Sequence, residues 1–303
     1  MPRSQLHPLS LRTLTLQEPI SYVAEIQTKI VSKNKGSFNG MGLKFSLRLL
    51  QKKENGTMHI EVKTHKRILL SKKKAPIKKF SKAQQIALQV AAINDHLIFE
   101  VSKNYGIQRL VNTKRVQESW GEIRTELRSE YPDIEEMISD FDWQLQNKYI
   151  QHIFLEDNFF NFLFPKLFNH DFKGKQPILI EKAISNGIHT HTIPILAKHT
   201  LKKFDTGFTQ VTVGTKGELQ TEHPKFPLAK LNTFIGSLGI PKGAHCDLNF
   251  NYAGSYELDG LKHYITKGQL RFSFEIKEHY LKETSFELFI DPKHRNKISK
   301  TTL

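Results

Sequence analysis

Hydrophobic and polar residues alternate with a period of two in the first quarter of the chain. The alternating stretches are 22–31, 41–50 and 58–70. Asn55 and Gly56 lie between the second and third stretches, and Asn-Gly between two alternating stretches is a strong hairpin signal. Gly36, Gly40 and Gly42 predict a loop between the first two stretches. The pattern therefore predicts an antiparallel meander.

Between residues 81 and 168 the apolar residues recur mainly at helical spacing. Ser81 and Gln84 form a capping-box pattern that predicts a helix start. Two longer amphipathic helices are predicted by apolar residues at 116, 120, 123 and 127 and at 134, 137, 138, 141 and 145. The stretches 97–101 and 107–111 predict a hairpin before these helices.

The last third of the chain returns to strand-like patterns. The predicted strands are 192–204, 208–213, 245–258, 268–276 and 286–290, with one short helix over 227–236. The predicted class is α+β, with a curved antiparallel sheet or sheets packed against a central helical block over 113–168. A Gly- and Pro-containing segment over 173–177 predicts a boundary between residues 1–172 and 173–303. The second sheet could also continue the first within one domain.

Composition indicates that the chain has a folded core and suggests a cellular location. Of 303 residues, 38% are hydrophobic and 21 are Phe, which is too much apolar material for a disordered chain. The amino terminus has no apolar run of signal-peptide length, and no stretch is long enough to span a bilayer. Cys246 is the single cysteine and cannot form an internal disulfide. We therefore expect a cytoplasmic protein.

Charge is distributed unevenly along the chain, whose net charge is +15. Residues 29–82 hold sixteen Lys or Arg against two acids, and residues 118–142 hold nine acids against two Arg. We expect a basic face that binds an acidic protein partner, formed by Lys44, Arg48, Lys52, Lys53, Lys63, Lys66, Arg67, Lys72, Lys73, Lys74, Lys78 and Lys79. An acidic face for a basic partner is expected from Glu118, Glu122, Glu126, Glu135 and Glu136.

Two other interpretations of the basic residues stay open. Lys and Arg on a sheet can neutralise phosphates, so the same residues could bind nucleic acid or another polyanion. Lys outnumbers Arg there, and no interleaved aromatic residues form a stacking platform, which disfavours nucleic acid. Lysines on exposed strands also protect sheet edges from aggregation.

A cluster of phenylalanines is the other unusual feature. Phe159, Phe160, Phe162 and Phe164 lie within one short segment. On a helix they form a broad apolar surface that a sheet could cover, which makes core packing the leading interpretation. The alternative is the lining of an apolar groove that holds a ligand or a partner helix.

Catalytic and metal-binding signals are weak. His189 and His191 are two residues apart, so they lie on one face of a predicted strand, whose side chains alternate between faces. His199 follows eight residues after His191. They are weak candidates for a metal site, and a metal-dependent hydrolase is the third function considered. No nucleophile elbow, P-loop or dinucleotide fingerprint occurs, so we expect no cofactor and no enzymatic activity.

Residues 81–168 resemble a pattern in uncharacterised bacterial β-rich proteins. The pattern consists of a strand pair with a Gly turn over 97–112, a Trp-bearing helix with Val116 and Trp120, and the aromatic segment 157–164. The resemblance implies a curved antiparallel sheet around helices, similar in outline to periplasmic lipoprotein carriers. Some cytoplasmic relatives look like accessory proteins of contractile secretion machines, by analogy of fold alone. It implies no catalytic residues and no family of known function.

These observations favour a non-enzymatic, cytoplasmic protein-binding adaptor. Its basic sheet face and acidic helical face would bind partners of opposite charge, such as cargo or a component of a bacterial secretion assembly. Nucleic-acid binding is the alternative. The oligomeric state is left open by the sequence.

Overall fold

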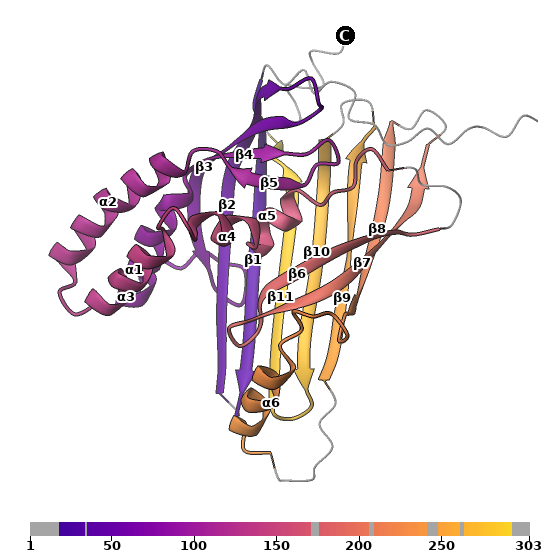
Figure 1. The fold of residues 1–303 in the computed structure, drawn as a ribbon. Helices are drawn as coiled ribbons and strands as arrows, with labels where there is room; N and C mark the ends of the chain where they lie inside the picture. The colour runs from indigo at the N-terminus through magenta and orange to yellow at the C-terminus, as the bar shows by residue number, and fades with distance from the viewer. Residues whose placement is uncertain are drawn as a thin grey trace, which may run out of the picture.

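The computed structural model describes residues 18–33, 35–170, 176–205, 209–240, 248–260 and 264–292. The predicted boundary between residues 172 and 173 lies outside these residues, as does Cys246. Within them the chain forms a large curled sheet with helices inside the curl and beside it (Figure 1).

Eleven strands of the described residues form one antiparallel sheet. Its order is β5-β4-β3-β2-β1-β11-β10-β9-β8-β7-β6. The first six strands are β1 Ile20–Ser32, β2 Lys35–Lys52, β3 Met58–Leu70, β4 His96–Val101, β5 Ile107–Leu110 and β6 Ile178–Ile188. The others are β7 His191–Phe204, β8 Gln210–Leu219, β9 Leu248–Asp259, β10 Tyr264–Ile276 and β11 Tyr280–Ile290. The predicted antiparallel meander over 22–70 is confirmed by β1, β2 and β3.

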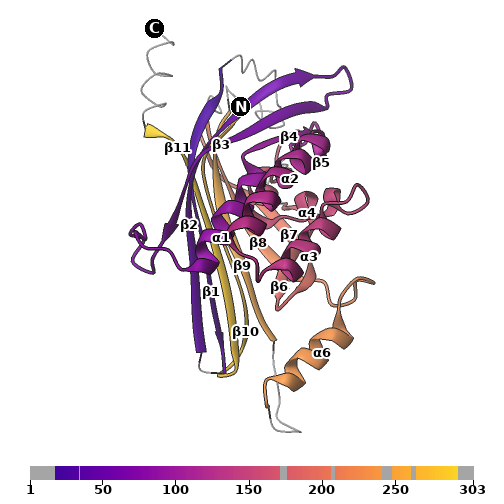
Figure 2. The ribbon, with the colours of Figure 1, turned by 90° about the vertical axis from the view of Figure 1, so that its left-hand side faces the viewer.

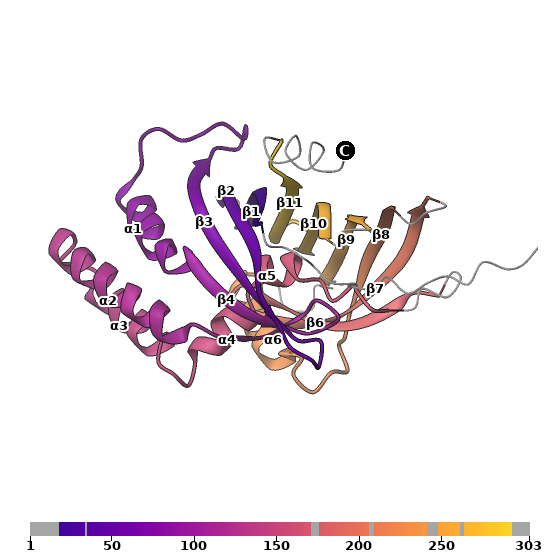
Figure 3. The ribbon, with the colours of Figure 1, turned by 90° about the horizontal axis from the view of Figure 1, so that it is seen from above.

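The two ends of the sequence meet in the middle of the sheet. β1 pairs with β11 over eleven residue pairs, from Tyr22 opposite Ile290 to Ser32 opposite Tyr280. This pairing joins the β1–β5 meander to the β6–β11 meander, so both predicted segments contribute strands to one sheet. Seen from above, the sheet curls until β6 and β7 lie opposite β1 and β11 (Figure 3).

Residue alternation gives the sheet a buried concave face and an exposed convex face. On β10, Leu270, Phe272 and Phe274 point to the concave side and are buried. Gln269 and Arg271, between them, are exposed on the other side. Successive side chains of a strand point to opposite faces, so this burial pattern follows from the sequence period of two.

The helices fall into three groups. They are α1 Lys82–Ala91, α2 Thr113–Glu130, α3 Glu135–Gln144, α4 Ile150–Leu155, α5 Asn158–Leu163 and α6 Leu228–Ser237, with a 3₁₀ turn over Ala92–Asn94. α1, α2 and α3 lie beside the β3–β5 end of the sheet, and α6 lies at its lower end (Figures 1 and 2). Of the helices within the described residues, α4 and α5 alone are inside the curl. The mixed α+β character is therefore as predicted. Much of the predicted central helical block, however, lies beside the sheet rather than at its centre.

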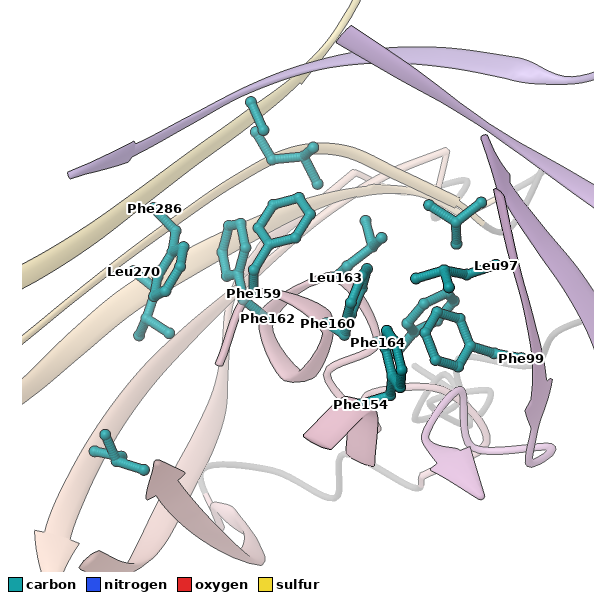
Figure 4. Packing of buried hydrophobic residues seen from close by; sticks show 14 of the residues in the cluster. Leu97, Phe99, Phe154, Phe159, Phe160, Phe162, Leu163, Phe164, Leu270 and Phe286 are labelled. Atoms are coloured by element: carbon teal, nitrogen blue, oxygen red, sulfur yellow. The ribbon is translucent and has the colours of Figure 1, made fainter. Parts of the chain in front are cut away.

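α5 fills the upper part of the concave side. Figure 4 shows its side chains Phe159, Phe160, Phe162 and Leu163 packed between sheet residues such as Phe99 and Phe286. The Phe162 ring stacks on the Phe286 ring with centroids 5.4 Å apart. Burying several aromatic rings of 150–250 Å² each makes this cluster a main source of stability, by roughly 2 to 3 kcal/mol per side chain.

Gly268 on β10 allows α5 to approach the sheet closely. A Cβ atom at this position would lie 2.9 Å from Cζ of Phe162, closer than Cβ contacts in proteins allow. Any larger residue at position 268 would push α5 away from β10. The backbone of one strand thus fixes the height of the helix above the concave face.

Three predictions of local structure need correction. Gly36, Gly40 and Gly42 lie within β2 rather than in a loop. Gly40 allows β3 to approach closely, because a Cβ at this position would lie 2.8 Å from the carbonyl oxygen of Leu70. Strand β6 and helix α4 were not predicted, and the short helix over 227–236 is confirmed as α6.

No helix within the described ranges combines the length and the apolar character needed to cross a bilayer.

Candidate functional site

A cavity of about 570 Å³ lies on the concave face below α5. Its floor is formed by three neighbouring strands, which contribute Ile26 from β1, Phe286 from β11 and Phe272 from β10. These positions share the inward side of their strands, since Ile26 is directly opposite Phe286 in the β1–β11 pairing. α5 adds Phe159, which is buried and contributes an aromatic wall.

The other side of the cavity is polar. The α4–α5 segment contributes His152 and Glu156, and the β6–β7 hairpin contributes Ser185, Asn186 and Thr192. His152, Glu156 and Asn186 are exposed, so they mark the side that opens to solvent. The cavity is therefore apolar at its floor and polar at its mouth.

Hydrogen bonds from the α4–α5 segment fasten it to the edge strand β6. The Asn158 side-chain amide donates to the Ser185 carbonyl at 2.8 Å, and the Ser185 N–H donates to the Asn158 side-chain oxygen at 3.1 Å. The Ser185 hydroxyl also donates to the Glu156 carbonyl at 2.6 Å. Asp157 caps α5 by accepting from the Phe160 N–H at 2.9 Å, and burial raises the pKa of Asp157.

Lys282 and two threonines supply polar groups on the inner face of the central strands. The Lys282 ammonium donates to the Asn186 carbonyl across the cavity, and burial lowers the pKa of Lys282. The hydroxyl groups of Thr28 and Thr284 are 3.2 Å apart. The cavity therefore holds one cation and two hydroxyl groups next to its aromatic floor.

A second pocket of about 410 Å³ adjoins this cavity at the free edge of β6. Glu156 and Thr192 line both spaces. The second pocket is lined by Lys166, Lys182 and Lys225, and it is therefore more basic than the first. A narrow space of about 20 Å³, lined by Asn158, Lys182 and Phe272 among others, lies between them.

The predicted histidine pair is divided between the β6–β7 turn, which holds His189, and the first residue of β7, His191. His189 has a positive φ of 52°, and its ring centroid is 6.0 Å from that of His191. The His189 backbone N–H donates to the Tyr280 hydroxyl at 3.2 Å, and its ring centroid lies 5.3 Å from that of Phe234 in α6. Burial, then His189 and Lys230, lower the pKa of His191.

His199 is not near this pair but is buried on the inner side of β7. Both of its ring nitrogens have no hydrogen-bond partner among the residues described, and burial together with Lys182 and His170 lowers its pKa to about 3. The described part of the chain holds no group of three or more His, Cys, Asp or Glu side chains placed to bind a metal ion.

The four phenylalanines of the proposed groove are mainly core residues. Phe160, Phe162 and Phe164 are buried among aromatic neighbours, including Phe99 and Tyr256. Phe159 is the exception, because it belongs to the core and also lines the cavity. The structure thus places one of the four at the candidate site.

The predicted basic residues are distributed over β2, β3 and the following connection. Several of them form ion pairs with acids: Lys44 with Asp291, Arg48 with Glu61, Lys53 with Glu100, Arg67 with Asp95, and Lys74 with Glu25 and Glu287. The other seven, Lys52, Lys63, Lys66, Lys72, Lys73, Lys78 and Lys79, are exposed and form no ion pair with a described residue. Part of the excess positive charge of this region is therefore locally balanced.

The Glu100 carboxylate shows how strong this balance is. Hydrogen bonds from Arg109, Lys53 and His59 lower the pKa of Glu100 to about 2. A depressed carboxylate pKa means that the interaction stabilises the fold above the ordinary Glu pKa and is lost as the pH falls toward 2. The basic strands thus use their charge within the sheet.

The predicted acidic residues are exposed on α2 and α3, away from the cavity. Glu118 lies 3.7 Å from Arg115, and Glu135 lies 2.5 Å from Arg128. Glu122, Glu126 and Glu136 are exposed on the same two helices. Figure 2 shows these helices to one side of the sheet, so the structure does not bring the acidic residues to the concave site.

No family model and no curated protein matches the chain. Among solved structures, it is similar to lipovitellin, in a study of its lipid–protein interactions, with a TM-score of 0.47 and 9% identity over 90% of this chain and 25% of that chain. The chain therefore spans about a quarter of the lipovitellin chain.

Two bacterial structures show weaker similarity. One is a domain from Vibrio parahaemolyticus assigned as an outer membrane lipoprotein-sorting protein, with a TM-score of 0.23 and 7% identity over 90% of this chain and 86% of that one. The other is a DUF1329 family protein from Desulfovibrio piger, with a TM-score of 0.16 and 9% identity over 94% and 91%. The predicted resemblance to bacterial β-rich proteins without a family of known function is confirmed.

These findings correct the functional prediction from the sequence. The predictions of a cytoplasmic location, of an acidic protein or nucleic-acid partner, and of an adaptor in a secretion assembly are wrong, because the similar structures concern lipid–protein interactions and lipoprotein sorting. The physical reason is visible in the fold as well. Five of the predicted basic residues pair with acids, and the main hollow of the concave face has an aromatic floor.

Apart from Phe159, the residues that line the cavity and the second pocket were missed because they do not cluster in the sequence. Lys182 and Lys282 each occupy an inward position in phase with apolar residues, Ile180 and Ile184 in one case and Phe286 in the other. A lysine in the apolar phase of a strand was the available signal. The sequence prediction followed runs of exposed charge instead.

Proposed function

We propose that the concave cavity binds a lipid-like amphiphile, a small molecule with an apolar chain and a polar end, and that the chain acts by binding and not by catalysis. One observation carries this proposal: the floor of the cavity is apolar on three adjacent strands while its mouth is polar. A ligand with one apolar and one polar part matches such a lining.

The size of the cavity supports a ligand of this kind. Ligand pockets in proteins have volumes of about 300 to 1,000 Å³. The cavity volume of about 570 Å³ falls within this range. It can hold part of an acyl chain together with a small polar group.

Apolar inward residues next to the cavity give a further reason. Ile26, Ile30 and Met41 point to the concave side but are only partly buried, because α5 covers the upper part of the sheet and not this part. Partly exposed apolar residues on an inward face lose unfavourable contact with water when an apolar chain covers them. The hydrophobic effect therefore favours an apolar occupant.

Titration with the uncharged fluorescent probe N-phenyl-1-naphthylamine tests the proposal. We expect saturable binding to the wild-type chain. Ile26→Asp should weaken binding at least about tenfold, because it places a charge against the apolar part of the ligand. Gln27→Asp is the matched control, since the adjacent side chain points to the convex face, and it should change the affinity less than about twofold.

Circular dichroism on both variants verifies that the fold is retained. Absence of saturable binding to the wild-type chain, or equal weakening by both substitutions, would contradict the proposed site.

A further inference from the structure

The second pocket, at the free edge of β6, contains lysines that form no ion pair with an acid of the described residues. Lys182 is on the inward side of β6, and its ammonium forms no hydrogen bond or ion pair with the described residues. Lys166 lies at the end of the α5 segment with a φ of 62°, and its N–H donates to the Tyr105 carbonyl at 3.1 Å. The backbone contact holds Lys166 beside the pocket.

These lysines differ from those of the basic strands. Lys53 and Lys74, for example, contact carboxylates at 2.6 to 3.0 Å. The second pocket is also lined by Glu156 and Glu181, but both are exposed at its rim, and no ion pair between described residues joins either one to Lys166 or Lys182. The positive charge inside the pocket is thus available to a ligand.

Other polar side chains line the pocket with the lysines. The Asn161 side-chain amide donates to the carbonyls of Leu155 and Asp157, at 2.7 and 2.9 Å, so both of its N–H groups are used within the fold. Gln220 and His223 also line the pocket and can supply further donors. Two cations with a nearby amide and an imidazole are suited to an oxyanion, such as a phosphate or a carboxylate.

The position of this pocket relates it to the cavity with the aromatic floor. Glu156 and Thr192 border both spaces, and Lys182 and Phe272 both border the narrow space between them. An amphiphile could therefore place its chain against Phe272 and its polar end near Lys182.

We propose that Lys166 and Lys182 form an oxyanion site that binds the anionic headgroup of the amphiphile whose chain occupies the concave cavity. This inference rests on the function proposed above. It restricts the ligand class to amphiphiles that carry a phosphate or carboxylate.

The protonation of Lys182 supports this assignment. Burial, then the charge of Lys166, lower the pKa of Lys182 to about 7. A partly buried cation without a partner is energetically unfavourable, and a bound anion would restore the charged form. A bound anion would therefore stabilise the charged forms of the two lysines, and the described residues do not provide such an anion.

Calorimetric titration with decyl phosphate, 1-decanol and inorganic phosphate tests the assignment. For the wild-type chain, we expect decyl phosphate to bind at least about tenfold more tightly than 1-decanol, because charge-assisted hydrogen bonds add to chain burial. Lys182→Met should remove most of this preference while changing the affinity for 1-decanol less than about twofold. Lys216→Met, at an exposed lysine of β8, is the control and should keep the preference.

The outcomes separate the two proposals. If decyl phosphate and 1-decanol bind but Lys182→Met and the double variant Lys166→Met/Lys182→Met keep the full phosphate preference, the headgroup site is wrong and the cavity stands. If neither amphiphile binds, the proposed function itself is wrong. If inorganic phosphate binds as tightly as decyl phosphate, the pocket serves a free oxyanion and the headgroup assignment is overturned.

Discussion

Two hollows of about 570 Å³ each lie on opposite faces of β1, β10 and β11. The concave one has Ile26, Phe272 and Phe286 at its floor. The convex one is lined largely by polar and charged side chains: Gln27, Ser255, Gln269, Arg271, Glu283, Ser285 and Glu287. The same strands thus produce two spaces of equal volume, one with an aromatic floor and one lined on these strands mainly by polar and charged side chains.

The polar groups of the convex hollow interact with one another. Gln269 donates to the Ser255 hydroxyl at 3.0 Å, and Arg271 forms an ion pair with Glu283. On the concave face the neighbouring positions of the same strands carry aromatic rings, Phe272 and Phe286, which are buried. The comparison teaches that volume alone does not indicate a ligand site, whereas the lining chemistry does.

The largest expected effect concerns the stability of the concave side. Phe162→Ala should lower the free energy of unfolding by about 3 to 5 kcal/mol, because it removes a buried ring and leaves a cavity beneath α5. Gln269→Ala, on the convex face of β10, should change it by less than about 0.5 kcal/mol. Urea unfolding measures both values. A loss below about 1 kcal/mol for Phe162→Ala would contradict the role of α5 as the concave core.

Removal of an inward cation should stabilise the fold. Lys182→Met is expected to raise the free energy of unfolding at pH 7 by about 1 to 3 kcal/mol, because it eliminates a partly buried charge without a partner. Lys216→Met, the exposed control on β8, should change it by less than about 0.5 kcal/mol. Thermal or urea unfolding compares the two variants with the wild-type chain.

The pH dependence of this gain has a defined sign. The pKa of Lys182 is about 7 in the folded chain and near 10.5 when unfolded, so the unfolded state binds more protons between these values. The contribution of this group to the free energy of unfolding of the wild-type chain therefore rises with pH across that window. The difference in this free energy between Lys182→Met and the wild-type chain should shrink toward pH 10.5. The other ionisable groups around the pocket are Lys166, Lys225, His170, His199, His223, Glu156 and Glu181. An advantage that grows with pH would contradict the pKa assignment.

A large side chain placed in each hollow tests which face of the sheet binds the ligand. Thr284→Trp adds a large ring to the concave cavity and should weaken N-phenyl-1-naphthylamine binding at least about tenfold, or about 1.4 kcal/mol. Ser285→Trp adds the same ring to the convex hollow and should leave the affinity within about twofold. Fluorescence titration of both variants gives the answer, and stronger weakening by Ser285→Trp would move the site to the convex face.

The smallest effect is expected on the convex face itself. Glu283→Gln breaks the ion pair with Arg271, whose side chain is 63% exposed. The loss in the free energy of unfolding should be at most about 0.5 kcal/mol and should decrease further at high salt. Unfolding at 0.05 and 1 M NaCl measures it. A loss above about 2 kcal/mol would show that the convex polar network is structural.

Local periodicity predicted the elements of the sheet well where it was regular. β1 and β3 follow clean alternation, and the α1 capping box formed by Ser81 and Gln84 is present as predicted. β6 was missed because Lys182 interrupts the apolar phase set by Ile180 and Ile184. The interruption that concealed the strand is also the residue that defines the second pocket.

The site itself depends on contacts that no local pattern contains. Ile26 and Phe286 are 260 positions apart in sequence and meet only because β1 pairs with β11. The curl of the sheet then decides which side of these strands is concave. The sequence therefore predicted an aromatic core around Phe160 and Phe162, but it could not place Lys282 opposite Asn186.

Photolabelling with a diazirine-bearing fatty acid tests the central claim most directly, because residue-level mass spectrometry distinguishes adjacent side chains of one strand. The account predicts labels on inward positions of β1 and β11, at Ile26, Thr28, Thr284 and Phe286, which compete with unlabelled fatty acid. Labels at Gln27 and Ser285 instead, or labels that do not compete, would contradict binding in the concave cavity.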